Sequence, residues 1–278
     1  KGPCRVALSG KGGTGKTTVS ALLIQALTGM GETPVLAVDA DPNANLNEAL
    51  GLPLRETLGS MREDAFTKSI PPGMSRTGYI EYRFQQVLVE SEGVDLLAMG
   101  RPEGTGCYCF ANRLLSEAMD LLTRHYRFVV MDMEAGMEHF SRGTIGIPDL
   151  LLVVSDPGAR GLRTAGRIRD LAITLGIPQR NIFFVINRAG QAVGAAGGAS
   201  ISGVGGVTGA GLGGGEGPAA GSGPVLDTSR ILASIPDDPE VEKADLEARP
   251  IIAIPEGSQA RRAVRGLAER VRSLCTGP

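Results

Sequence analysis

Residues 10–17 of the chain read GKGGTGKT. This stretch fits the pattern of a glycine, four residues and then Gly-Lys-Thr, which is typical of a phosphate-binding loop. Successive backbone N–H groups of such a loop surround phosphate oxygens, and the following helix directs its positive end at them. Residues 4–8 form an apolar run, and residues 17–31 repeat apolar side chains at helical spacing. This strand–loop–helix context predicts a nucleotide-binding site.

Two side chains of the loop have distinct predicted roles. Lys16 would neutralise the β and γ phosphates, and the Thr17 hydroxyl would ligate Mg²⁺. The predicted nucleotide-binding residues of this segment are Gly12, Gly13, Thr14, Gly15, Lys16, Thr17 and Thr18.

The rest of the chain alternates short apolar runs with helical stretches. The runs are rich in Val, Ile and Leu, as expected of parallel strands covered on both faces. We therefore predict one P-loop domain over residues 1–278, of class α/β, with a doubly wound and mostly parallel sheet. Further strands are expected at residues 34–38, 94–98, 128–131, 150–154, 181–186 and 231–235, and helices at 112–124, 163–175 and 258–274.

Two segments break this alternation. Residues 53–89 are mixed in character, and we expect an inserted helical or irregular lobe there. Residues 191–224 consist mostly of Gly, Ala and Ser and carry almost no charge, so we expect a disordered surface insertion and assign it no function.

Composition limits the class of protein. A formal net charge of −2 shows no basic bias of the kind that nucleic-acid binding requires, and no apolar run approaches the length of a membrane span. Four cysteines, two of them nearly adjacent, do not form a secreted disulfide framework. We expect a cytoplasmic protein that binds neither nucleic acid nor membrane, with structural roles for Cys4 and Cys275.

Lys11 is unusual, because most phosphate loops have no lysine at this position. The form KGGTGKT resembles the deviant Walker A loop of the family that includes cell-division positioning ATPases, plasmid-partition ATPases and the nitrogenase iron protein. The resemblance implies that Lys11 crosses a subunit interface to the partner's nucleotide, and therefore an ATP-dependent homodimer.

Carboxylates follow two of the predicted strands. Asp39 and Asp41 lie in VLAVDADPN, residues 35–43, and Asp132 ends FVVMD, residues 128–132. Side chains at the carboxyl ends of parallel strands reach the ligand site of an α/β sheet. The family resemblance implies that Asp41 orients or activates the attacking water, while Asp39 and Asp132 join Thr17 around magnesium. The implied catalytic residues are Lys11, Lys16 and Asp41.

The resemblance also assigns the adenine contacts. Asn187, which ends FFVIN, matches an adenine-reading asparagine of the family. The stretch IPDD, residues 235–238, resembles a late loop that closes over the base with Pro236 and Asp237.

Cys107 and Cys109 stand one residue apart in GTGCYCF, residues 104–110. Paired thiolates in a glycine-rich loop suit soft metals, but a structural zinc site needs four ligands. A two-fold axis near this loop would bring together four sulfurs from two chains. Other interpretations are two buried thiols or a strained disulfide, and His139 is a further ligand type that we expect to be a supporting residue.

The cysteine pair and the stretch MDMEAGMEHFSRGT, residues 131–144, resemble the CooC-type nickel-insertion ATPases of carbon monoxide dehydrogenase maturation and their acetyl-CoA synthase counterparts. The resemblance implies an Mg-ATP-dependent metallochaperone that binds Ni²⁺ or Zn²⁺ at Cys107 and Cys109. Its partner would be the apo form of such a nickel enzyme, and its nucleotides ATP and ADP.

Two alternatives stay open. One is an iron–sulfur electron-transfer ATPase, although no cysteine follows Asp132 where those proteins take their second ligand. The other is a positioning or partition switch, which would use the arginine-rich amphipathic helix at residues 258–274 on a membrane or on DNA. A terminal helix of this kind more commonly packs its apolar side on the sheet.

Overall fold

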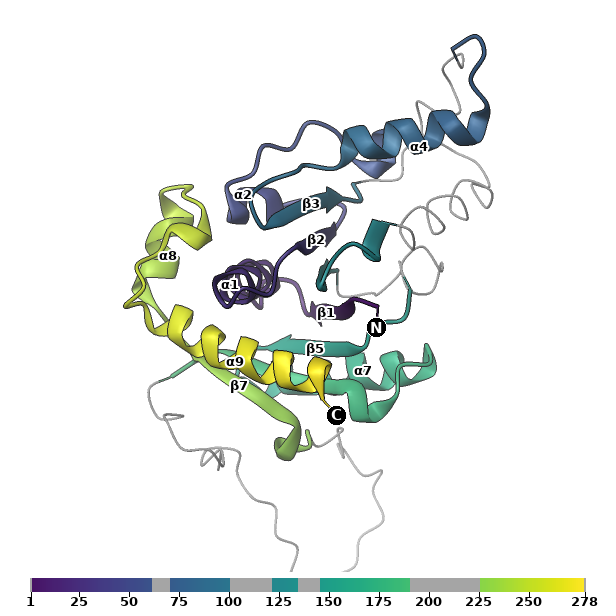
Figure 1. The fold of residues 1–278 in the computed structure, drawn as a ribbon. Helices are drawn as coiled ribbons and strands as arrows, with labels where there is room; N and C mark the ends of the chain where they lie inside the picture. The colour runs from purple at the N-terminus through teal and green to yellow at the C-terminus, as the bar shows by residue number, and fades with distance from the viewer. Residues whose placement is uncertain (1, 62–70, 101–121, 135–145, 191–225, 278) are drawn as a thin grey trace, which may run out of the picture.

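The structure is a computed structural model that describes residues 2–61, 71–100, 122–134, 146–190 and 226–277 (Figure 1). The chain alternates strands and helices along most of its length, as the sequence predicts. In chain order the elements are β1 (Cys4–Gly10), α1 (Lys16–Gly29), β2 (Val35–Ala40), α2 (Leu46–Leu50), α4 (Arg76–Val87), β3 (Val94–Ala98), β4 (Phe128–Met133), β5 (Leu150–Ser155), α7 (Ala159–Thr174), η1 (Gln179–Asn181), β6 (Ile182–Ala189), η2 (Thr228–Arg230), β7 (Ile231–Pro236), α8 (Pro239–Leu246), η3 (Ile251–Ala253) and α9 (Gln259–Thr276).

The strands form one seven-stranded sheet with the order β3-β2-β4-β1-β5-β6-β7. Each pairing between neighbouring strands is parallel. The carboxyl ends of all seven strands therefore lie along one edge, and the phosphate loop leaves β1 at this edge. The predicted doubly wound α/β sheet is confirmed.

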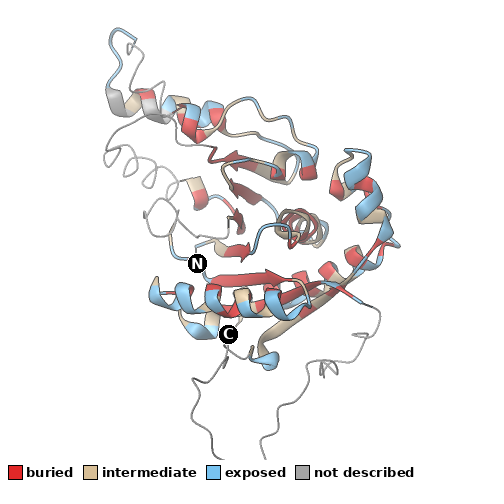
Figure 2. Cartoon of the chain, turned by 180° about the vertical axis from the view of Figure 1, so that it is seen from behind, coloured by how far each residue is buried: buried red, intermediate tan, exposed pale blue. Residues whose placement is uncertain are grey.

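Helices cover both faces of the sheet. Successive side chains of a strand point to opposite sides, so neighbouring residues belong to different hydrophobic clusters. Val6 and Leu8 face a cluster built with α1, α2 and α9, whereas Ala7 faces a second cluster that includes α4 and α7. Figure 2 shows that the strands are almost wholly buried, while the helices expose their outer sides. Burial on both faces is the physical reason for the continuous apolar runs in the sequence.

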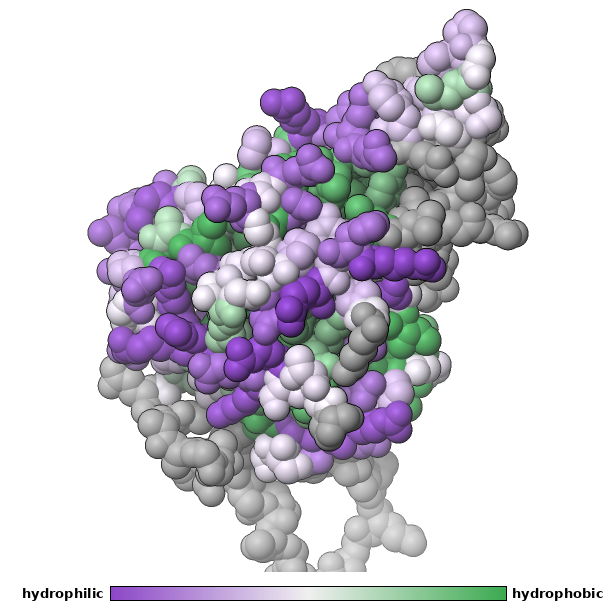
Figure 3. All heavy atoms as spheres, viewed as in Figure 1, coloured by the Kyte–Doolittle hydropathy of each residue, from purple (hydrophilic) through white to green (hydrophobic). Residues whose placement is uncertain are grey.

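The terminal helix α9 packs on the body of the domain. Ser258 begins it, with its Oγ accepting from the Arg261 N–H at 3.1 Å. Its apolar stripe lies against α1 and β7 and is buried. Hydrophilic residues predominate over α8 and along α9 on the outer face (Figure 3). The interpretation that this helix packs on the sheet is confirmed, and the stripe consists of Ala260, Val264, Leu267, Ala268 and Val271.

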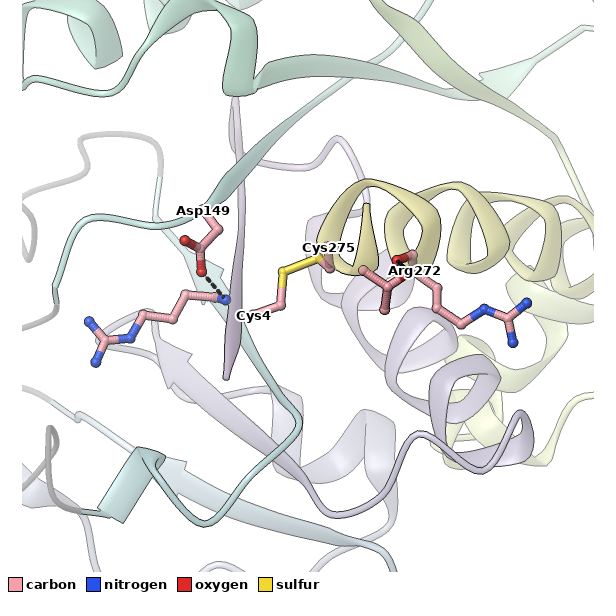
Figure 4. Close-up of a disulfide and its surroundings, with 6 residues drawn as sticks. Cys4, Asp149, Arg272 and Cys275 are labelled. Carbon is pink, nitrogen blue, oxygen red and sulfur yellow. Dashed lines mark hydrogen bonds between the residues drawn. A yellow bond between two sulfur atoms is a disulfide. The ribbon is translucent and has the colours of Figure 1, made fainter. Parts of the chain in front are cut away.

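A disulfide joins the two ends of the described chain. Cys4, the first residue of β1, is bonded to Cys275 in the last turn of α9, with their Cα atoms 5.8 Å apart (Figure 4). Structural roles are predicted for both residues from the sequence, but a bond between them is not. They are 271 residues apart, so their proximity follows from how α9 crosses the sheet, not from local sequence.

Several predicted boundaries differ from the observed ones. Strand β2 continues to Ala40 and β4 to Met133, while α7 begins at Ala159 instead of residue 163. The expected lobe at residues 53–89 contains α4. Residues 112–121 of the predicted helix and all of the segment 191–224 lie outside the described residues. Of the helices that the structure describes, none combines the length and apolarity needed to cross a bilayer.

Candidate nucleotide-binding site

The phosphate loop is closed by hydrogen bonds to one carbonyl group. The Lys11 carbonyl accepts from the Thr14 N–H at 3.3 Å, from the Thr14 hydroxyl at 2.8 Å and from Lys16 Nζ at 3.4 Å. Gly15 has a φ of 84°, and a Cβ there would meet the Asn187 amide nitrogen at 2.3 Å. This position therefore needs glycine both for its left-handed backbone and for its close contact.

The amino end of α1 is open to an anion. Gly15 supplies no side-chain cap, and the first turn of α1 carries no acidic residue. The first N–H groups of a helix have no partner inside the helix, and its dipole favours negative charge there. The loop and α1 together therefore form the kind of site that binds phosphate groups.

Two carboxylates lie beside the loop on neighbouring strands. Asp39 of β2 and Asp132 of β4 are register partners, and each is about 1 % exposed. The Thr17 hydroxyl donates to Asp132 Oδ2 at 2.6 Å, and the Ser20 hydroxyl donates to Asp132 Oδ1 at 3.2 Å. Asp39 accepts from the backbone N–H groups of Asp41 at 3.1 Å and Leu46 at 2.8 Å. The end of the β sheet thus holds two buried acids next to the first turn of α1.

Burial controls the charge of this pair. It raises the pKa of Asp39 to about 7, assisted by repulsion from Asp132, although the N–H groups of Leu46 and Asp41 oppose the shift. Burial likewise raises the pKa of Asp132 to about 6, against the opposing effects of Thr17 and Lys16. Two desolvated carboxylates with a hydroxyl beside them suit a hard cation that prefers oxygen ligands. The residues present therefore fit magnesium.

The other predicted catalytic residues lie on accessible parts of the same edge. Asp41 is half-buried in the loop after β2, where its Oδ1 accepts from the Asn43 N–H at 2.9 Å. Lys11 is exposed on the phosphate loop. The structure thus places Lys11, Lys16, Asp39, Asp41 and Asp132 at one edge of the sheet.

The predicted adenine residues reach this edge from β6 and β7. Asn187 is buried, and its Nδ2 donates to the Thr14 carbonyl at 2.8 Å, so it supports the phosphate loop directly. Asp237 is exposed, and its N–H donates to the Ala189 carbonyl at 3.4 Å. The loop that starts with Pro236 and Asp237 therefore lies beside the end of β6.

Two residues of the site, Ser20 and Arg188, are not predicted from the sequence. Ser20 binds Asp132, and a signal existed, because Ser20 follows Thr17 by one helical turn. Arg188 has a φ of 54°, and its guanidinium donates to the Gly13 carbonyl at 3.2 Å. An arginine after a strand gives no sequence signal of this left-handed backbone.

The predicted metal ligands Cys107 and Cys109, and the predicted supporting residue His139, belong to the same part of the sequence. Cys107, Cys109 and His139 lie outside the described residues, as do residues 135–144 of the stretch that follows Asp132. Within the described ranges, no group of three or more His, Cys, Asp or Glu side chains could hold a metal ion.

Comparison with known sequences agrees with this geometry. Residues 6–196 match the family model described as CobQ/CobB/MinD/ParA nucleotide binding domain. The chain is 44 % identical over 187 residues to an uncharacterized ATP-binding protein of Methanocaldococcus jannaschii, covering 66 % of this chain and 74 % of that protein. It is 38 % identical over 205 residues to the carbon monoxide dehydrogenase accessory protein CooC of Rhodospirillum rubrum, covering 68 % and 76 %.

Solved structures show the same fold. The septum site-determining protein MinD of Pyrococcus horikoshii, complexed with Mg-ADP, superposes with a TM-score of 0.63 at 22 % identity over 99 % of this chain and 98 % of that chain. MinD of Aquifex aeolicus gives a TM-score of 0.64 at 20 % identity over 97 % of both chains. With the matched domain, the phosphate loop and the paired acids, this chain belongs to the CobQ/CobB/MinD/ParA nucleotide binding domain family and is an ATPase.

Proposed function

We propose that this ATPase is an Mg-ATP-dependent nickel metallochaperone that serves an enzyme of the carbon monoxide dehydrogenase type. The observation that carries the proposal is the Cys107–Cys109 pair in a chain that is 38 % identical to a carbon monoxide dehydrogenase accessory protein. The phosphate loop binds ATP, whose hydrolysis supplies the energy, and the cysteines bind the nickel ion.

Different residues of the nucleotide site have different roles in hydrolysis. Lys16 and the N–H groups of the loop hold the phosphates, while Thr17, Asp132 and Asp39 would hold magnesium. Bound magnesium supplies positive charge that offsets the charge developing on the phosphates. Asp41 is the residue that orients the attacking water, because it is half-buried beside the loop and not fully enclosed like Asp39.

A homodimer completes both sites in this proposal. Lys11 is exposed while its own carbonyl closes the loop, so its ammonium group is available to a nucleotide on the partner. The same two-fold axis would bring two cysteine pairs together and give four thiolates for one metal ion. Binding of ATP would then assemble the metal site, and hydrolysis would open it.

The proposal places the protein in the cytoplasm, where ATP and client apoenzymes are available. The membrane alternative needs a free apolar side on α9. Val264, Leu267 and Val271 of that side are buried against α1 and β7, whereas Leu274 near the end of the helix is exposed. We propose no membrane and no nucleic-acid partner.

Equilibrium dialysis against Ni²⁺ with a non-hydrolysable ATP analogue tests the cargo site. The expected result is that the Cys107→Ser/Cys109→Ser variant loses nickel binding and retains ATP hydrolysis. The Cys4→Ser/Cys275→Ser variant removes the same number of cysteines, which are joined by a disulfide and not free, and is expected to keep the metal. Stoichiometric nickel in the first variant would refute the assignment of the site. A brown protein whose iron and sulfide disappear with Cys107 would favour the iron–sulfur alternative.

A further inference from the structure

The last residues of β6 contact the phosphate loop through two consecutive side chains. Asn187 Nδ2 donates to the Thr14 carbonyl at 2.8 Å, and Arg188 Nη1 donates to the Gly13 carbonyl at 3.2 Å. In a regular strand, consecutive side chains point to opposite faces of the sheet, so only one of the two could reach the loop. The end of β6 therefore departs from regular strand geometry.

The backbone of Arg188 provides this departure. Its φ is 54°, in the left-handed region that an arginine rarely adopts. The pairing of β6 with β7 also shifts register between Ile186 and Ala189, the residues on either side of Asn187 and Arg188. The left-handed conformation changes the direction of the Arg188 side chain, so that it reaches the same loop as Asn187. Such a conformation costs free energy and persists only where the surrounding structure imposes it, often at a functional site.

The two hydrogen bonds hold successive peptide groups of the phosphate loop. In a planar trans peptide the carbonyl and the N–H point in opposite directions, so a bond that fixes the carbonyl also directs the N–H. The peptide held by Arg188 carries the Thr14 N–H, which closes the loop on the Lys11 carbonyl at 3.3 Å. The peptide held by Asn187 carries the Gly15 N–H, which has no hydrogen-bond partner in the described part of the chain. The end of β6 thus fixes the closure of the loop and the direction of an N–H group that is open to a phosphate.

The positive charge of Arg188 is not shared with a carboxylate. The residue is exposed, and within the described ranges its guanidinium forms no ion pair, only the hydrogen bond to the Gly13 carbonyl. A guanidinium has several N–H donors and is always charged, so this bond leaves both donors and charge available. Arg188 therefore adds to the charge of Lys16 at the edge of the sheet where the phosphates bind.

We propose that Arg188 is a positioning residue for nucleotide binding, which acts through the Gly13 carbonyl of the phosphate loop. With the guanidinium in place, the loop keeps the closed conformation in which its N–H groups face the phosphates. Without the guanidinium, the loop adopts this conformation in a smaller fraction of the molecules. The apparent affinity for a nucleotide falls in proportion to that fraction.

This role is separate from the chemical step. The residues assigned to magnesium and to the attacking water belong to α1, β2, β4 and the loop after β2, and Arg188 binds none of them in the described part of the chain. A change at Arg188 therefore alters how well the nucleotide binds and not how fast the bound nucleotide reacts. The proposal rests on the ATPase activity and is independent of nickel.

Steady-state hydrolysis of Mg-ATP by the full chain tests the proposal. Arg188→Gly removes the guanidinium and tolerates the left-handed backbone. We expect its KM for Mg-ATP to rise on the order of tenfold, because a hydrogen bond from a charged group is lost, while kcat stays within about threefold of the wild type. Calorimetric titration with Mg-ADP should show a matching loss of affinity in the absence of hydrolysis. A purely structural role would instead lower the amount of folded protein, and therefore the apparent kcat, at an unchanged KM.

Two further variants assign the effect to Arg188. Arg180→Gly removes the same side chain from an exposed position on η1, which precedes β6 at its opposite end, and should keep the KM of the wild type. Arg188→Ala should share the raised KM of Arg188→Gly but unfold at a lower urea concentration, because alanine is strained at a positive φ and glycine is not.

Three results would each overturn the proposal. They are a KM of Arg188→Gly within about twofold of the wild type, an equal rise of KM in Arg180→Gly, and a loss of kcat without a change of KM. Equal unfolding midpoints of Arg188→Gly and Arg188→Ala would overturn the explanation that a left-handed backbone brings this side chain to the loop.

Discussion

The Thr17 hydroxyl donates a hydrogen bond of 2.6 Å to the Asp132 carboxylate, which joins the first turn of α1 to the end of β4. Ser20, one turn further along α1, donates to the second oxygen of the same carboxylate. Thr17 and Asp132, two of the residues that would hold magnesium, are thus in direct contact. The fold itself therefore positions both side chains beside the phosphate loop.

Asp132→Asn tests the role of this carboxylate. The amide keeps the shape of the side chain but loses its charge, and such outer-shell changes lower metal affinity or activity by about 10- to 100-fold. We expect a loss of this size in ATP hydrolysis measured against magnesium concentration. Asp245→Asn, a matched change at an exposed position on α8, should have no effect. Unaltered magnesium dependence in Asp132→Asn would contradict the assignment.

Asp39 makes the stability of the nucleotide-free protein depend on pH. Its pKa is about 7 in the folded protein against an ordinary value of 3.8, mainly because it is buried. Between these values the folded state binds more protons than the unfolded state, so this group lowers the free energy of unfolding as pH rises.

Urea unfolding of the wild type and of Asp39→Asn, without magnesium or nucleotide, measures this contribution. We expect the stability of the variant relative to the wild type to increase from about pH 4 to about pH 7 and to level off above the folded pKa. A difference that stays constant across this window would show that Asp39 titrates at an ordinary pKa.

Asn187→Ala tests the support that β6 gives to the phosphate loop. The change removes the hydrogen bond from Nδ2 to the Thr14 carbonyl. A loss of about 1 to 1.5 kcal/mol in the free energy of nucleotide binding corresponds to roughly tenfold weaker affinity. Calorimetric titration with Mg-ADP measures the affinity. Asn181→Ala removes the same group at the opposite edge of the sheet and should bind normally. Equal affinities of the two variants would contradict the role of Asn187.

Asp238 and Asp237 are neighbours with separate roles. The Asp238 carboxylate caps α8 through the Glu240 N–H at 3.0 Å and accepts from the Ala260 N–H at 2.9 Å and the Ser258 hydroxyl at 2.7 Å. Asp238→Ala should therefore cost about 2 kcal/mol or more in the free energy of unfolding.

Asp237→Ala, at an exposed position, should change that free energy by less than about 0.5 kcal/mol. It should instead weaken nucleotide binding, because Asp237 lies in the loop proposed to cover the base. Chemical denaturation and calorimetric titration of both variants separate the two effects, and a large stability loss in Asp237→Ala would show that this separation is wrong.

The sheet could be predicted from sequence because parallel strands buried on both faces require continuous apolar runs. The ends of the strands were less predictable, since β2 and β4 continue through Asp39 and Asp132 to Ala40 and Met133. An acid normally marks the end of a buried run, but here hydroxyl and backbone donors surround the carboxylates inside the sheet edge. The early start of α7 was missed because Gly158 supplies no side-chain cap.

The site was predictable where chemistry follows a local motif. The phosphate loop is recognisable by the spacing of its glycines and lysines. The place of Asp39 in the site is predictable because this residue comes at the end of an apolar strand. Arg188 and the Cys4–Cys275 bond were not predictable, because the first depends on a left-handed backbone and the second on how α9 crosses the sheet. Contacts between residues that are far apart in the sequence cannot be predicted from the spacing of neighbouring residues.

Native mass spectrometry of the protein with Ni²⁺ and a non-hydrolysable ATP analogue tests whether two chains share one metal ion. We predict one species that contains two chains, two nucleotides and one nickel ion. Lys11→Ala should shift this species to monomers, and Cys107→Ser/Cys109→Ser should leave a dimer without nickel. Nickel bound to single chains, or retained by dimers that lack both cysteines, would contradict a metal site shared across the nucleotide-bound pair.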